Sequence, residues 1–217
     1  LRVKVADRLG NSMSSDVVSL TVLSLVQFRG KIRQELQLVA EQLANLKKLL
    51  QLSAMQTQSL GDRLVETTDH AIRLEAGDLS RGLLLQHRST ASLLDSGPQS
   101  ILGRLELIGK SFEGEAMLPT LVQAFEQFNQ IATELDQQLL PLVQSKIREL
   151  TLLSEVVDDV DVRGDGQLNS DTNRLQMVQY TNDIVLLLET SIAKLELLMQ
   201  EQVHNQRVAE FADFWAE

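Results

Sequence analysis

The stretch IRQELQLVAEQLANLKKLL, from Ile32 to Leu50, decides the fold of this chain. Its apolar residues recur at alternating intervals of four and three residues: Ile32, Leu36, Val39, Leu43, Leu46 and Leu50. This spacing lines them up along one face of an α-helix, as in the seam of a coiled coil. The stretch therefore predicts an amphipathic helix that packs against other helices.

A second heptad-like pattern lies towards the other end of the sequence. Four apolar residues follow one another at intervals of seven, with two leucines between them: Val178, Val185, Ile192 and Met199, interleaved with Leu188 and Leu195. The chain is rich in Leu, Gln, Glu and Ala, with only 4% aromatic residues and three prolines, which favours long helices over sheets. Residues 25–217 are therefore predicted to form a mainly α-helical, elongated antiparallel bundle.

Breaks between the helices are indicated by turn-forming residues. The clearest is Asp95-Ser96-Gly97-Pro98, where Gly ends one helix and Pro begins the next. Further breaks are expected at residues 109–119, at Pro141 and at residues 158–171.

The heptad seam meets two small polar residues, Ser53 and Thr57, before apolar residues return at Leu60 and Leu64. Small polar residues at core positions mark a layer that sets the register, a kink or a ligand pocket. The structural interpretations are favoured over the pocket.

The first 24 residues follow a different pattern. Residues 2–7 alternate polar and apolar side chains, residues 17–22 are rich in β-branched residues, and the segment between them contains Gly10 and Asn11. This pattern predicts a β-hairpin. A local N-terminal arm, or edge pairing with another subunit, are the alternatives.

The hairpin residues Val3-x-Val5-x-Asp7, Gly10-Asn11, Ser14-Ser15 and Val18-x-Leu20-Thr21-Val22 resemble the last two strands of a bacterial immunoglobulin-like or fibronectin-type domain. The resemblance covers about a tenth of the chain. It implies a modular extracytoplasmic, surface or phage-particle protein, of which this chain, opening on Leu1, is expected to be an excised or processed piece. A cytoplasmic location stays open.

The net charge of −10 is unevenly distributed along the chain. Residues 1–110 hold 14 Lys and Arg against 11 Asp and Glu, whereas residues 111–217 hold 6 against 19. Either the two halves pack as complementary helices or the acidic half faces a basic partner. An acidic chain lacks the basic face that nucleic acid requires. No apolar run approaches the roughly 20 residues of a transmembrane helix.

One loop has the outline of a calcium site. In residues 161–172, Asp161, Asp165 and Asn169 fall where an EF-hand or dockerin-type loop places oxygen ligands. Arg163 and Thr172 replace two further ligands, which weakens the match. The alternative is an acidic, solvated connection between two helices. Calcium is therefore the single cofactor that the sequence suggests, and it depends on this loop.

The C-terminal residues Phe211, Phe214 and Trp215, together with Val208, form an apolar stripe at helical spacing. Such a stripe either packs against the bundle or, where exposed, binds in the groove of a partner protein.

No motif for nucleophilic, metal-dependent or phosphate-binding chemistry accompanies these features, so we expect no enzyme and no catalytic residues. The sequence favours a structural or interaction module that binds a protein partner or associates with itself. Two alternatives stay open: an extracytoplasmic helical-bundle sensing domain, with a ligand pocket near Ser53 and Thr57, and a secreted apparatus or pore-forming component.

Overall fold

The computed structural model describes residues 4–6, 12–14, 24–66, 70–112, 118–160 and 166–216, and these are mainly helical. The helices in chain order are α1 (Leu25–Glu66), α2 (His70–Leu94), α3 (Ile101–Phe112), α4 (Pro119–Glu134), the π-helical segment η1 (Leu135–Leu139), α5 (Leu140–Val160) and α6 (Gly166–Ala216). Within this part of the chain, no helix combines the length and the apolar character that a membrane crossing requires.

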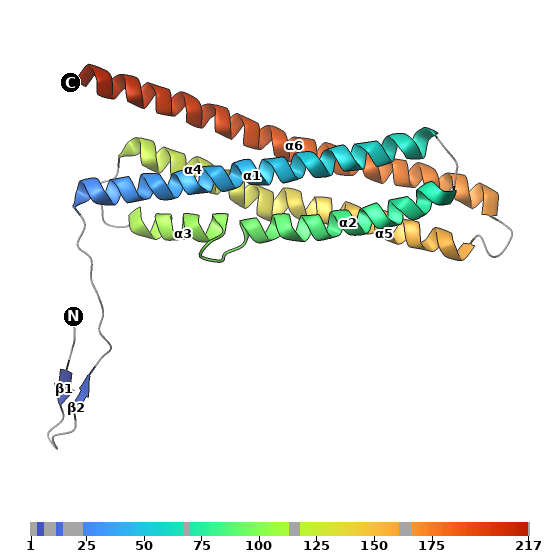
Figure 1. The fold of residues 1–217 in the computed structure, drawn as a ribbon, viewed down its shortest axis with the longest axis horizontal. Helices are drawn as coiled ribbons and strands as arrows, with labels where there is room; N and C mark the ends of the chain where they lie inside the picture. Colours follow the sequence, from blue (N-terminus) through green and yellow to red (C-terminus); the bar gives the residue numbers. More distant parts are fainter. Residues whose placement is uncertain are drawn as a thin grey trace.

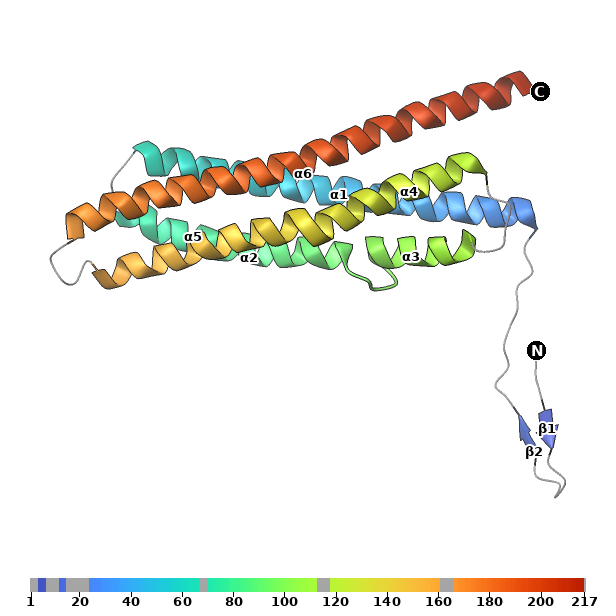
Figure 2. The same ribbon diagram turned by 180° about the vertical axis from the view of Figure 1, so that it is seen from behind.

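The helices alternate in direction and form an elongated bundle (Figure 1). After α1, the chain returns along α2 and α3, runs forward again through α4, η1 and α5, and returns once more in α6. The chain thus forms four arms: α1, then α2 with α3, then α4 with η1 and α5, and finally α6. The α1 helix packs against α6 and α2, and α5 packs against α2 and α6, so each arm lies beside two others. Figure 2, seen from behind, shows the same arrangement, with α6 and α5 nearer the viewer. The prediction of a helical bundle is confirmed.

The heptad seam of α1 faces the interior of this bundle. All six seam residues are buried, and Val39 and Leu46 are completely inaccessible. They belong to one apolar core that continues into the other helices, where Leu83, Leu105, Leu150 and Leu195 are also buried. The seam is therefore filled by helices of the same chain.

The α1 helix begins with a capping box. The backbone amide of Gln27 donates to Ser24 Oγ at 3.2 Å, and the amide of Ser24 donates to Gln27 Oε1 at 3.0 Å. Two amides that the first turn leaves without a helical partner are thereby satisfied. The Ser-x-x-Gln pattern fixes where the heptad helix starts.

A tight turn separates α2 from α3 at the break predicted from residues 95–98. The carbonyl groups of this turn lie against the start of α3, where a Cβ atom on Gly103 would lie only 1.9 Å from the carbonyl oxygen of Gly97. Ser100 Oγ donates to the carbonyl oxygens of Asp95 and Gly97. The turn therefore requires a residue without a side chain at position 103.

Pro141 was expected to kink or break a helix, but the residues on both sides of it stay helical. The irregularity takes the form of η1, in which the amide of Leu140 donates to the carbonyl oxygen of Leu135, five residues back. A proline inside a helix cannot donate to the carbonyl four residues earlier and its ring crowds that group. A π-helical turn widens the backbone just before Pro141 and relieves this crowding.

The N-terminal part shows two short strands, β1 (Lys4–Ala6) and β2 (Ser12–Ser14), which pair antiparallel with Val5 opposite Met13. The β2 strand falls between the two predicted strands, in the segment that contains Gly10 and Asn11. The second predicted strand, residues 17–22, lies outside the described residues. The hairpin of residues 1–24 and its immunoglobulin-like resemblance therefore stay predictions.

Candidate binding grooves

The polar residues in the seam of α1, Ser53 and Thr57, are buried, and the Thr57 hydroxyl is hydrogen-bonded within its own helix. Thr57 is completely buried, and its Oγ1 donates to the carbonyl oxygen of Ser53 at 2.8 Å. Other buried hydroxyls donate in the same way to a carbonyl three or four residues earlier: Ser80, Thr90, Thr151, Ser154, Thr181 and Ser191. These donors are already satisfied, so they offer little to a ligand inside the bundle.

Small residues in the same region let the helices approach closely. A Cβ atom on Gly61 of α1 would lie 2.9 Å from Thr181 Oγ1 of α6. On the other side of the bundle, a Cβ on Gly77 of α2 would lie 3.2 Å from Ser154 Oγ of α5. The polar layer therefore acts as a closely packed section of the core, in agreement with the structural interpretation.

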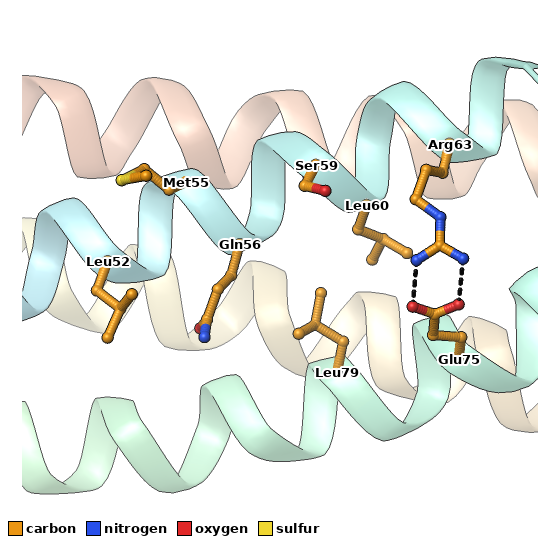
Figure 3. A pocket seen from close by; sticks show the side chains of 8 residues that line it. All are labelled: Leu52, Met55, Gln56, Ser59, Leu60, Arg63, Glu75 and Leu79. Carbon is orange, nitrogen blue, oxygen red and sulfur yellow. Dashed lines mark hydrogen bonds and ion pairs between the residues drawn. The ribbon is translucent and has the colours of Figure 1, made fainter.

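The hollows that a partner could enter lie on the surface. The first is a groove of about 340 Å³ between α1 and α2 (Figure 3), lined by Leu52, Met55, Gln56, Ser59, Leu60, Arg63, Glu75 and Leu79. Figure 3 shows Leu52, Gln56 and Leu60 pointing towards α2, whereas Met55 and Ser59 lie on the other side of α1. Leu52 and Met55 are 47% and 70% exposed, which leaves apolar surface at the rim.

A two-pronged ion pair closes one end of this groove. Arg63 Nη2 donates to Glu75 Oε2 at 2.5 Å, and Arg63 Nη1 contacts Glu75 Oε1. The hydrogen bond and the charge of Glu75 raise the pKa of Arg63 above its ordinary value, so the guanidinium stays charged. Because both side chains are solvent-exposed, the pair orients α1 and α2 more than it stabilises the fold.

A second groove, of about 490 Å³, follows the opposite side of the same stretch of α1, next to α6. Its lining is Ala54, Met55, Gln58, Ser59, Asp62, Arg63, Glu66, Val185 and Glu189. Ala54 and Val185 are nearly buried, whereas the three acidic residues are exposed. The groove thus has an apolar floor and an acidic rim.

A third groove, of about 470 Å³, lies between the start of α1 and α3 and includes Phe28, Ile32 and Ile108. Here Arg104 Nη1 donates to Glu35 Oε2 at 2.7 Å, and Arg104 Nη2 donates to Gln99 Oε1 at 2.6 Å. Arg104 therefore ties α3 and the turn before it to α1, and its donors are engaged within the chain.

The residues proposed from sequence for calcium and partner binding fall largely beyond what the structure describes. Asp161 and Asp165 lie outside the described residues. Asn169 lies on the first turns of α6, where the structure describes the backbone only. Phe211, Phe214 and Trp215 lie on the last turns of α6, and their side chains are likewise outside the description. Both proposals stay predictions. Among the described residues, no group of three His, Asp or Glu side chains is placed to hold a metal ion.

One buried titratable residue, His87, faces the α2–α5 side of the bundle. Burial lowers its pKa below the ordinary value of 6.5, and the positive charge of Arg148 lowers it further. The imidazole is therefore neutral at pH 7.

The groove residues Met55, Arg63 and Glu75 were not singled out from the sequence. Met55 lies off the heptad seam. It could have been found from the sequence as an apolar residue of the helix that does not belong to the buried face. The Arg63–Glu75 pair depends on how α1 and α2 meet, which periodicity does not give.

No family model, curated protein or solved structure matches the chain.

Proposed function

We propose that the chain is a non-enzymatic interaction module, a helical bundle that packs partners or further subunits in a larger surface, secreted or phage-particle assembly. The N-terminal resemblance to an immunoglobulin-like domain supports the modular context. The heptad seam of α1 is buried within the chain, so the faces available for a partner are the outer ones.

The observation that carries this proposal is a row of exposed leucines on α6. Leu175, Leu186 and Leu197 are 63%, 65% and 59% exposed and follow each other at intervals of 11 residues. Eleven residues make three helical turns, so the three side chains share one face and span about 33 Å along the axis. Single exposed leucines are ordinary, but an aligned row along one helix suits the packing of a second helix.

The two alternatives receive less support. A sensing domain would use a pocket at Ser53 and Thr57, and the Thr57 hydroxyl that a ligand would need already donates to the backbone carbonyl of Ser53. A pore-forming component rests on the amphipathic helices alone, and liposome binding with a large structural change would favour it.

The test is light scattering coupled to small-angle X-ray scattering over a range of protein concentrations, with and without calcium. We expect the chain to self-associate, and the triple variant Leu175→Gln/Leu186→Gln/Leu197→Gln to lose this association. At a concentration at which the parent is monomeric, the melting temperature of this variant should differ little from that of the parent, since these side chains are exposed. The matched control Leu74→Gln/Leu85→Gln/Leu142→Gln, which removes three exposed leucines elsewhere, should still associate.

A different pair of results would favour the sensing domain. The chain would then be a monomer at every concentration, and small organic ligands would raise its melting temperature.

A further inference from the structure

We propose that the groove between α1 and α6 binds a basic amphipathic helix of a partner protein. This inference rests on the proposed role as an interaction module and names the chemistry of the partner. It is carried by the apolar floor of the groove, the exposed methionine on its rim and the surplus of negative charge around it.

The floor and the rim have the composition of a helix-binding surface. Ala54 and Val185 are nearly buried at the base, while Met55 is 70% exposed beside them. Methionine is flexible and polarisable, so an exposed one adapts to the shape of an incoming apolar side chain. From Ala54 to Glu66 the groove follows α1 for about 18 Å, which is roughly three turns of a bound helix.

The charge around the groove is negative. Asp62, Glu66 and Glu189 are exposed on its rim, whereas its one cation, Arg63, is paired with Glu75 on the α2 side. Asp62 accepts a hydrogen bond from the neutral Gln58 at 2.9 Å. The ion pairs found within the described ranges involve none of the three rim acids.

The distribution of ion pairs over the whole bundle points the same way. The basic first half and the acidic second half were expected either to neutralise each other or to leave the acidic side for a partner. Within the described part of the chain, Lys47–Glu196 joins the two halves at 3.0 Å, whereas the other interhelical pairs stay within one half: Arg63–Glu75, Arg104–Glu35, Lys146–Asp183 and Lys194–Glu134.

Glu189, which belongs to the acidic half, is thus left outside these ion pairs, and Asp62 and Glu66 of the first half join it on the rim of the groove. A helix with Lys or Arg flanking its apolar stripe complements the rim, whereas an acidic helix is repelled.

The absence of cysteine from the sequence allows a local reporter. Ser59 is exposed and lines the groove, so a Ser59→Cys variant carries a single environment-sensitive fluorophore there. Ser89→Cys on the exposed face of α2 gives a matched reporter elsewhere. The probe is a synthetic Leu/Lys amphipathic helix, and a Leu/Glu helix of the same apolar pattern is its control.

We expect the Leu/Lys helix to change the fluorescence at position 59 in a saturable way, with no change at position 89 and none with the Leu/Glu helix. The variant Glu66→Gln/Glu189→Gln should weaken binding by about tenfold. The variant Glu126→Gln/Glu155→Gln removes the same charge from exposed positions elsewhere and should weaken it less than about twofold. Far-UV circular dichroism checks that both variants fold.

Equal weakening by the two double variants would show unspecific attraction to an acidic protein and overturn the proposal. A response at position 59 that ignores Glu66 and Glu189 would place the helix in the α1–α2 groove, which Ser59 also lines, and would overturn it as well. A fluorescence change at position 59 that follows protein concentration without peptide would assign the groove to a second copy of the chain.

In each of these cases the interaction module survives if the leucine row on α6 still mediates association. The proposed role as an interaction module is contradicted by a different result: the chain stays monomeric and small organic ligands raise its melting temperature.

Discussion

A methyl group added at a glycine of this bundle either clashes with the backbone, as at Gly103, or stabilises the helix without a clash, as at Gly82. At Gly103 a Cβ atom would meet the carbonyl of Gly97, whereas nothing lies within 4 Å of a Cβ on Gly82. We expect Gly103→Ala to lower the free energy of unfolding by about 1–3 kcal/mol, because backbone atoms of the turn must move. Gly82→Ala should raise it by about 0.5–1 kcal/mol, since it favours the helix without a clash. Urea denaturation measures both, and a stabilising Gly103→Ala would contradict the close contact.

His87 gives the bundle a specific pH dependence. Its pKa in the folded chain is lower than the ordinary 6.5, so below about pH 6.5 the unfolded chain binds a proton that the folded chain resists. The contribution of His87 to stability is complete above that pH and declines as the pH falls towards the folded pKa. We expect His87→Gln to show a smaller drop in melting temperature between pH 7.5 and pH 5 than the parent chain.

The exposed His204 is the matched control for this experiment. His204→Gln changes an exposed position of α6 and should keep the pH dependence of the parent. The same slope in the parent and in both variants would show that His87 takes up its proton as readily in the folded chain as in the unfolded one.

At the scale of the elements, the two prolines of the third arm occupy opposite kinds of position. Pro119 begins α4, where a missing amide costs nothing, and Pro141 lies in a helix interior, exposed, just after η1. Pro141→Ala should raise the free energy of unfolding by up to about 3 kcal/mol, because it restores a donor and removes the crowding. Pro119→Ala should be nearly neutral. Equal effects in urea denaturation would show that η1 has a cause other than Pro141.

The sequence predicted the helices well, because the spacing of α1 and the turn residues at 95–98 each report on one segment by itself. The capping box at Ser24 and Gln27 was also readable from the sequence and was missed. The fit of Gly103 against its turn, the Arg63–Glu75 pair and the groove beside α6 were not predictable, since each depends on how two segments meet. A proline in a helical pattern indicates an irregularity, but not whether it becomes a break or a π-helical turn.

At the scale of the whole molecule, the seam of α1 is shared by all the arms of the bundle. Leu46 is completely buried in the common core, whereas Leu38, which precedes the seam residue Val39 in the sequence, is 36% exposed. We expect Leu46→Ala to lower the free energy of unfolding by about 2–5 kcal/mol, because it leaves a cavity between helices. Leu38→Ala should cost less than about 1 kcal/mol.

The dependence of these losses on protein concentration decides whether the seam serves the fold or an assembly. A core within one chain gives the same loss for Leu46→Ala at every concentration, whereas a seam between subunits gives a loss that grows with concentration, because only the assembled chain uses the seam. Urea denaturation at low and high concentration makes the comparison. We expect the loss for Leu46→Ala to be the same at both concentrations, because the neighbours of Leu46 in the core belong to its own chain. An association through the leucine row of α6 would stabilise the parent and the variant alike and leave this difference unchanged.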